Sequence, residues 1–271
     1  SAASDVYKRQ LLTIEGGVID GTNAVQAIYT RWYNTGYDLG KTIIHENVTI
    51  KGKITGVDAY YDIHESNTSI LEVSLSMSDG WAIVNALKDQ KGSRLPAKAK
   101  LSIKLLKDIA LPKEGYIFNR KNVVLDLNGK ALSLAYEEGQ TRNNYGTLVI
   151  AQSKVTINDS STTQTGKVIN TDTTGGKLTA KNDYNYAIRV GKNADLIINA
   201  GYYYSSASSS GAGSSCIYIY NNPRAYSAKV TINGGVFATE KDYNGTYFVL
   251  NVDDTNNYKS QFIVNAGTFI N

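Results

Sequence analysis

VTINGGVFA, at Val230–Ala238, is one copy of a nine-residue pattern that recurs along the chain and decides its fold. Three further clear copies are LTIEGGVID at Leu12–Asp20, LIINAGYYY at Leu196–Tyr204 and FIVNAGTFI at Phe262–Ile270. Degenerate copies are VTIKGKITG at Val48–Gly56, LDLNGKALS at Leu125–Ser133 and VTIN at Val155–Asn158. Alternating apolar residues in each copy predict short strands joined by a glycine turn.

The copies in the second half of the chain recur at a nearly constant spacing. Their third positions are Leu127, Ile157, Ile198, Ile232 and Val264, which lie 30, 41, 34 and 32 residues apart. The insertion DSSTTQT accounts for the one long interval. A further apolar strand precedes most copies, and no intervening segment has the helical periodicity expected of a βαβ crossover. Units of this kind, each pairing with the next, predict an all-β parallel solenoid.

One corner of this solenoid is expected to carry a ladder of stacked asparagines. The strand alternation points Val230, Ile232 and Phe237 inward, and it puts one asparagine of each copy in the same position. The ladder residues are Asn128, Asn158, Asn199, Asn233 and Asn265. Stacked side-chain amides hydrogen-bond along the stack, so we interpret the ladder as structural. The residues that follow are predicted to permit the bend; these are Gly129, Ala200, Gly234 and Ala266.

These repeats resemble the right-handed parallel β-helix of the pectin-lyase-like superfamily, in particular the repeat regions of large surface proteins of gut bacteria. The resemblance covers residues 100–271 well and residues 11–56 in part. It implies an architecture rather than an activity, because the superfamily includes lyases, hydrolases, tailspikes and adhesins. A right-handed parallel β-helix is therefore the predicted fold.

The repeat is interrupted between Ile50 and Leu127. Asp79 followed by GWAIVNALKDQ has the N-cap, the apolar stripe and the glycine stop of a short helix, predicted near residues 79–91. Such a helix suits the capped end of a solenoid. Residues 76–271 are predicted to form a capped block truncated at its C-terminus, and residues 11–75 the last rungs of a preceding block. One continuous solenoid with a long excursion is the alternative.

The first ten residues, SAASDVYKRQ, have no signal-peptide pattern. The run SDVYKRQ resembles translated sequencing adapter, so we interpret residues 1–10 as an artefact at the end of a metagenomic fragment. A short disordered tail is the other interpretation. If the chain is a fragment, the missing signal says nothing about export.

The composition excludes several classes of protein. The formal net charge of +4, from 28 Lys and Arg against 24 Asp and Glu, is too small for a broad nucleic-acid face. The single cysteine excludes an internal disulfide and a cysteine-rich zinc site. No apolar run approaches the ~18 residues of a membrane span. The unusual feature is the excess of tyrosine, with 20 Tyr against 5 Phe and 2 Trp.

The sequence contains no recognisable catalytic set. In the β-helix hydrolases that the repeats resemble, an NTD tripeptide acts with a DD pair and a histidine–glycine pair. Here Asn170-Thr171-Asp172 lies more than 80 residues from the only DD pair, Asp253-Asp254. Neither histidine, His45 or His64, precedes a glycine. No catalytic residue and no cofactor is therefore predicted.

Two polar stretches contain the residue types that bind metals. One is Asp58, Asp62, His64 and Glu65, and the other is Asp253, Asp254, Asn256 and Asn257. The second stretch offers oxygens suited to calcium, but it lacks the glycine and the terminal glutamate of a calcium loop. Both are interpreted as solvated polar segments, and no metal site is predicted.

The tyrosines supply the candidate binding residues. Tyr202 and Tyr204 flank the inward Tyr203, while Tyr218 and Tyr220 share one face of IYIY, so all four are expected to face solvent. Exposed rings on a sheet bind sugar rings or anchor a protein partner. The alternative is that these rings only stack on one another and stabilise the sheet.

The function predicted from these features is a non-catalytic extracellular module of a bacterial surface protein, acting as an adhesin or stalk. Its expected partners are glycans or host surface proteins, and neither nucleic acid nor a membrane span is expected. A polysaccharide lyase or glycoside hydrolase of the same fold is the second hypothesis. A phage tailspike segment is the third.

Overall fold

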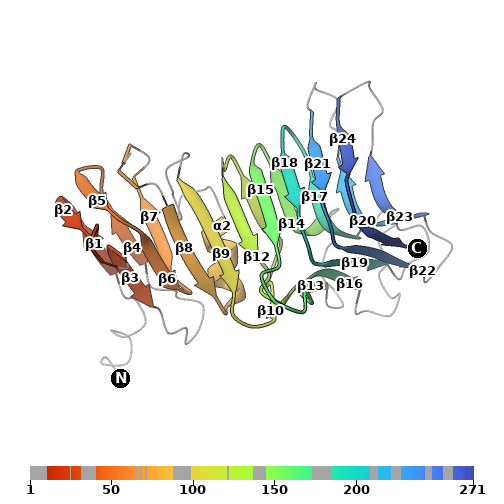
Figure 1. Ribbon diagram of the computed structural model, residues 1–271, viewed down its shortest axis with the longest axis horizontal. Coiled ribbons are helices and arrows are strands. Elements are labelled where there is room, and N and C mark those ends of the chain that lie inside the picture. Colours follow the sequence, from red (N-terminus) through yellow and green to blue (C-terminus); the bar gives the residue numbers. More distant parts are fainter. Residues whose placement is uncertain are drawn as a thin grey trace.

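The computed structural model is a solenoid of parallel strands that runs along the longest axis of the molecule (Figure 1). It describes residues 11–24, 26–31, 41–64, 66–67, 69–70, 72–87, 99–120, 122–136, 145–172, 185–207, 213–220, 227–241, 246–252 and 259–271. The N-terminal stretch at residues 1–10 and the acidic stretch at residues 253–257, both singled out in the sequence, lie outside these ranges.

Three sheets form the walls of the solenoid over most of its length. The nine-stranded sheet contains β3 (Ile28–Arg31), β6 (Ile54–Val57), β8 (Glu72–Met77), β9 (Lys100–Leu105), β12 (Val123–Asp126), β15 (Lys154–Asn158), β18 (Asp195–Ile198), β21 (Lys229–Ile232) and β24 (Gln261–Val264). The six-stranded sheet contains β10 (Ile109–Ala110), β13 (Ala131–Tyr136), β16 (Lys167–Asp172), β19 (Tyr202–Ala207), β22 (Val236–Lys241) and β25 (Thr268–Ile270). The five-stranded sheet contains β11 (Gly115–Phe118), β14 (Tyr145–Ala151), β17 (Asn185–Val190), β20 (Gly213–Ile219) and β23 (Thr246–Val252).

Each turn of the solenoid passes through the three sheets in the same order. The chain runs from β12 to β13 to β14, one strand in each sheet, and then returns as β15 beside β12. The pairs between successive turns are parallel in all three sheets. Because each strand completes its hydrogen bonds on the strands one turn before and one turn after, the predicted all-β parallel β-helix is confirmed.

The side chains that the alternation points inward form one continuous hydrophobic core. Val230, Ile232 and Phe237 are completely buried, as predicted, and so are Leu196, Ile198 and Tyr203 of the preceding turn. Aromatic rings stack along the axis inside the six-stranded sheet. The ring centroid of Phe237 lies 4.9 Å from that of Tyr203 and 5.2 Å from that of Phe269.

The predicted register is wrong by two residues at the first clear turn. Asn158 pairs with Asp126, not with Asn128, and Ile157 pairs with Leu125. A shift of two residues leaves every side chain on the same face of a strand, so the apolar pattern did not reveal it. Asn128 lies beyond the strand, and its amide donates instead to the carbonyl of Leu105, 2.9 Å away.

The amides of the remaining four ladder positions are hydrogen-bonded in series. Each Nδ2 donates to the Oδ1 of the preceding turn over 2.8 Å. The series runs through Asn158, Asn199, Asn233 and Asn265. The prediction that the residue directly after each asparagine makes the bend holds at Gly129, with φ of 73°, but it is wrong in the three turns that follow Asn199, Asn233 and Asn265. In those three turns the bend is made one residue later, where Gly201, Gly235 and Gly267 have φ of 110°, 109° and 148°, a region that favours glycine.

Replacing Asn233 with alanine is expected to lower the free energy of unfolding by about 1 kcal/mol, because one amide–amide bond is lost on each side. The corner is exposed, so water replaces part of the interaction. Urea unfolding of the variant measures the change. Thr231→Ala, on the outer face of the same strand, serves as the control. Equal stability of the two variants would mean that the ladder is not stabilising.

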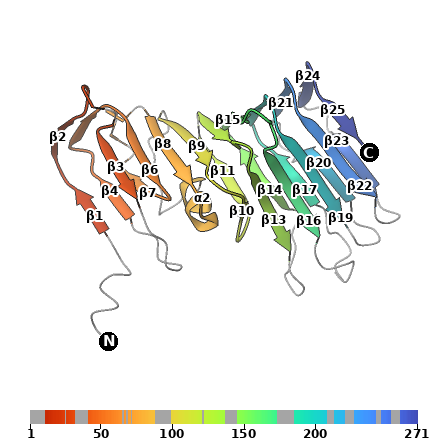
Figure 2. The same ribbon diagram turned by 60° about the horizontal axis from the view of Figure 1, so that its bottom comes forward.

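The predicted helix is present as α2 (Gly80–Leu87), and it lies inside the array instead of at an open end (Figure 2). Its residues Ala82, Ile83, Val84, Ala86 and Leu87 are buried, and it packs against β7 (Tyr60–Ile63), β8 and β11. The Asp79 carboxylate caps it by accepting from the amide of Ala82 over 2.9 Å. Among the described residues, no helix is long and apolar enough to cross a membrane.

The helix divides two walls of the solenoid but not the third. On its N-terminal side, the walls beside the nine-stranded sheet are a three-stranded sheet of β1 (Leu11–Ile14), β4 (Lys41–Ile44) and β7, and a two-stranded sheet of β2 (Gly17–Asp20) and β5 (Val48–Lys51). The nine-stranded sheet continues from β6 through β8 to β9 without a gap. One sheet therefore crosses residue 76, and the division at this residue stays a prediction.

Candidate functional site

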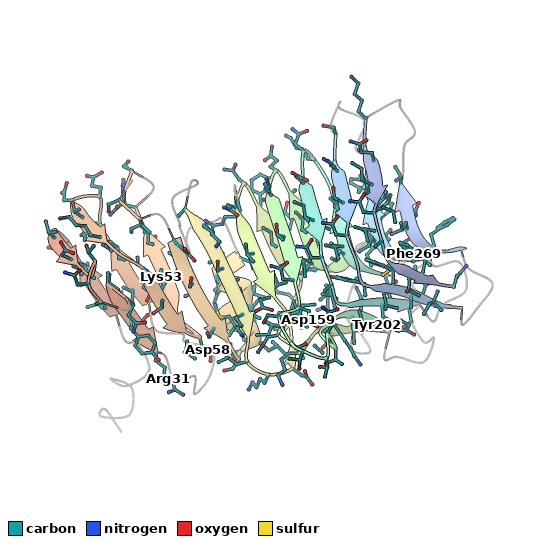
Figure 3. All side chains as sticks on the ribbon, in the orientation of Figure 1. Arg31, Lys53, Asp58, Asp159, Tyr202 and Phe269 are labelled. Atoms are coloured by element: carbon teal, nitrogen blue, oxygen red, sulfur yellow. The ribbon has the colours of Figure 1, made fainter. Side chains whose placement is uncertain are left out.

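The four candidate tyrosines lie on two different walls of the solenoid. Tyr202, which is labelled in Figure 3, is on β19 in the six-stranded sheet. Tyr204 is on the same strand, and the two ring centroids are 6.3 Å apart. Tyr218 on β20 and Tyr220 directly after it belong to the five-stranded sheet, with centroids 6.0 Å apart. All four are partly exposed. They therefore lie in two patches on different sheets, and a binding role for any of them stays a prediction.

The patch on the five-stranded sheet includes residues from two successive turns. The ring of Tyr218 stacks on that of Tyr186 with a centroid distance of 4.4 Å. The guanidinium of Arg189 lies over the ring of Tyr220, 4.3 Å from its centroid. Arg189 pairs with Tyr218 across β17 and β20, so the two tyrosines and the arginine are held by strand register. A cation over an aromatic face is attractive, which fixes the position of the guanidinium.

A hollow of about 340 Å³ lies between this patch and Tyr116 on β11. We call it the arginine–tyrosine groove, and its lining residues are Tyr116, Val149, Ile150, Ala151, Arg189, Gly191, Lys192 and Tyr220. Tyr116 pairs with Val149, and Val149 pairs with Arg189. The large side chains of Tyr116 and Arg189 therefore stand on either side of the smaller side chain of Val149. The small residues Ala151 and Gly191 lie between the rings and leave the space open.

The charged lining residues of the groove are Arg189 and Lys192, both basic. The carboxyl of Glu114 lies close enough to Arg189 for the positive charge of the guanidinium to act on it. Burial raises the pKa of its carboxyl, and the charges of Lys113 and Arg189 oppose that shift. Lys113 itself lies over the ring of Trp81, 5.0 Å from the centroid. Two cations and two exposed rings in one hollow suit a ligand that has both a flat face and an anionic group.

The patch on the six-stranded sheet is simpler. The amine of Lys167 lies 5.8 Å from the ring centroid of Tyr202, and Lys167 pairs directly with Tyr202 in the strand register. Val236 and Ala238 face the two tyrosines from the next strand. The rings here stack along one strand and against small apolar neighbours, which is the arrangement expected of sheet stabilisation.

A second hollow, of about 530 Å³, follows the outer face of the nine-stranded sheet from β3 to β15. The repeat pattern does not predict this hollow, because its central strands belong to the interrupted part of the repeat. We call it the hydroxyl groove. Its lining residues are Gln26, Tyr29, Thr55, Gly56, Val57, Ser74, Leu75, Ser76, Ser102, Ile103, Lys104, Val124, Asp126, Asn158 and Ser160. The run of Thr and Ser at outward strand positions was the signal in the sequence.

Two of the polar residues considered for chemistry, Asn170 and Asp58, have structural roles. Asn170 of the NTD tripeptide is buried, and its amide donates to the carbonyl of Tyr186 over 2.8 Å. Asp58 accepts from the backbone amides of Ser78 and Asp79, 2.6 and 3.0 Å away, and so ties a turn to the start of α2. His64 lies 3.5 Å from Glu46 on the surface.

No group of three or more His, Cys, Asp or Glu side chains is placed to hold a metal ion within the described ranges. Glu65 and the stretch at residues 253–257 lie outside those ranges. Cys216 is buried, and its thiol donates to the carbonyl of Tyr203 over 3.1 Å. Burial raises the pKa of this thiol well above its usual value, so it is held neutral.

Comparison of the chain with protein-family profiles, with curated proteins and with solved structures found no match.

Proposed function

We propose that the chain is a non-catalytic binding module of an extracellular bacterial surface protein, and that it binds glycans through the arginine–tyrosine groove. The observation that supports this most directly is the guanidinium of Arg189 held over Tyr220 beside a 340 Å³ hollow. The likeness of the repeats to surface proteins of the pectin-lyase-like superfamily supports the location. A stiff parallel β-helix also suits a stalk that holds such a groove away from the cell.

The chemistry of the groove favours acidic glycans. The faces of Tyr116 and Tyr220 are suited to stacking on sugar rings. The guanidinium of Arg189 binds carboxylate or sulfate groups through paired hydrogen bonds, and Lys192 adds a second positive charge. A ligand that uses both kinds of interaction has to present a sugar ring and an anion together.

Replacing Arg189 with alanine is expected to weaken binding of uronic-acid or sulfated oligosaccharides about tenfold or more, since a charge-assisted hydrogen-bond pair is lost. Titration calorimetry against a panel of these oligosaccharides measures the effect. Tyr220→Ala is expected to weaken binding as well, because it removes both the stacking face and the partner of Arg189. Raising the salt concentration should reduce the affinity of the unchanged chain.

Tyr204→Ala is the matched control, because Tyr204 is a partly exposed tyrosine on a different wall. Its binding should equal that of the unchanged chain. Equal affinity of the Arg189 variant and the control would refute the groove as the binding site. Release of reducing ends or unsaturated sugars from the same oligosaccharides would instead favour the lyase or hydrolase hypothesis.

A further inference from the structure

The hydroxyl groove lies on a different wall from the arginine–tyrosine groove and has a different chemistry. It crosses six neighbouring strands, β3, β6, β8, β9, β12 and β15. At about 4.8 Å between neighbouring strands, that run is about 24 Å long. Its length along one continuous sheet suits an extended chain instead of a compact molecule.

The floor of the groove is a file of hydroxyl groups set by the strand register. Thr55 pairs with Ser74, and Ser74 pairs with Ser102, so three hydroxyls follow one another on successive strands. The Thr55 hydroxyl donates to the side-chain oxygen of Gln26 over 2.7 Å, and the Ser74 hydroxyl donates to Glu72 over 3.0 Å. Each of these hydroxyls still has lone pairs to accept from a ligand.

The charged lining residues of the groove cancel one another. Lys104 and Asp126 are direct neighbours in the register, and their side chains are 3.9 Å apart. The Asp126 carboxylate also accepts from the backbone amide and hydroxyl of Ser160, over 2.9 and 2.6 Å. The amide of Asn158 comes next on β15. The groove therefore offers hydrogen bonds of both polarities without a net charge.

An aromatic ring stands at the N-terminal end of the groove. Tyr29 on β3 lines it, and half of its surface is exposed. Tyr29 pairs with Thr55, so the ring continues the file of hydroxyls by one strand. A flat apolar face at the end of a row of hydroxyls matches a sugar chain, whose rings have apolar faces and hydroxyl rims.

We infer that the hydroxyl groove binds an unbranched, uncharged oligosaccharide, with its hydroxyls on Thr55, Ser74 and Ser102 and one ring on Tyr29. The balanced charge argues against a uronic-acid or sulfated ligand here. An extended peptide is the competing occupant. It gains most of its affinity by pairing its backbone with a free sheet edge, whereas this groove crosses the face of the sheet, where every groove strand except the edge strand β3 is paired on both sides. The inference does not rest on the proposed function, because no residue is shared by the two grooves.

The test is binding of neutral gluco-, xylo- and manno-oligosaccharides to the whole chain, measured by titration calorimetry. Ser102→Ile puts a β-branched apolar side chain in the middle of the groove, which suits a strand but fills the space and removes a hydroxyl. It is expected to weaken binding about tenfold or more, because a hydrogen bond and the fit are both lost. Tyr29→Ala, on another strand, should also weaken binding.

Thr231→Ile is the matched control. Thr231 is on β21 of the same sheet, in the same outward file, and outside the groove. It should leave the affinity unchanged. Circular dichroism checks that each variant is folded. No binding of any neutral oligosaccharide to the unchanged chain would overturn the inference, as would equal affinity of Ser102→Ile, Tyr29→Ala and Thr231→Ile. Displacement of the sugar by uncharged peptides but not by other sugars would assign the groove to a peptide.

Discussion

Replacing Phe237 with alanine is expected to lower the free energy of unfolding by about 3–5 kcal/mol, the usual cost of truncating a buried phenylalanine. The side chain is completely buried in the six-stranded sheet. Its ring lies between those of Tyr203 and Phe269, with interplanar angles of 9° and 14°. Truncation therefore opens a cavity in the middle of the aromatic stack. The strands on either side are held in place by their own backbone hydrogen bonds. The site has little room to collapse.

Equilibrium unfolding in urea measures the change, with circular dichroism as the probe. Val236→Ala is the control, because Val236 is the preceding residue of the same strand and points to the partly exposed face. It is expected to cost less than about 1 kcal/mol, the range of a partly exposed side chain. A loss below that value for Phe237→Ala would mean that the aromatic stack does not stabilise the solenoid.

Strand periodicity accounts for the parts of the fold that the sequence predicted. Burial in a strand repeats every second residue, so the inward residues of a copy such as Val230, Ile232 and Phe237 follow from the apolar pattern alone. The same periodicity explains the error at the first clear turn. A shift of two residues between Asn128 and Asp126 leaves all faces unchanged, and only hydrogen bonds at the corner distinguish the two registers.

The candidate site was predicted only in part, because a site on a solenoid joins residues from different turns. Alternation within β20 correctly put Tyr218 on the outer face. The neighbours that give this tyrosine its chemistry are Tyr186 and Arg189, which come from the previous turn. Their position depends on the register of β17 against β20. The apolar pattern fixes that register only to the nearest two residues.

The hydroxyl groove was missed for a related reason. Its central strands β8 and β9 lie in the stretch between Ile50 and Leu127, where the nine-residue pattern is absent. The chain still adds these strands to the nine-stranded sheet, because α2 takes the place of a strand in the other walls. The helix was readable from its N-cap and apolar stripe. Its effect on the neighbouring sheet depends on packing, so that effect could not be predicted from the sequence.

Asp159 is the second residue for which we expect a large effect. It begins the seven-residue insertion, and its carboxylate accepts four hydrogen bonds. The donors are the amide of Gly129 at 2.7 Å, the amide and hydroxyl of Ser161 at 3.2 and 2.7 Å, and the amide of Gly166 at 2.6 Å. The residue is 7% exposed. One carboxylate thus closes the insertion and joins it to the preceding turn.

Replacing Asp159 with alanine is expected to lower the free energy of unfolding by about 2–3 kcal/mol, because several backbone amides lose a charged acceptor at once. Urea unfolding at neutral pH measures the loss. Asp108→Ala is the control for the loss of a weaker carboxylate contact. Asp108 is exposed and accepts one hydrogen bond, from the amide of Ala131 over 2.8 Å. Its loss should be smaller. Equal losses would mean that the insertion is held by other contacts.

The same carboxylate is expected to make stability depend on pH in the acidic range. Burial opposes ionisation, but the hydrogen bonds from Ser161, Gly166 and Gly129 outweigh it and lower the pKa of Asp159 in the folded chain. Because the pKa is lowered in the folded chain, ionised Asp159 makes its full contribution to the free energy of unfolding above about pH 3.9, the pKa of an aspartate in the unfolded chain. This contribution is lost as the pH falls below that value. The unchanged chain should therefore lose more stability as the pH falls below about 4 than Asp159→Asn, whose side chain does not titrate. Asp20, whose pKa is lowered to about 2 by hydrogen bonds from Thr22, titrates equally in both proteins and cancels from the comparison. Parallel loss in the two proteins would show that Asp159 does not set the acid limit.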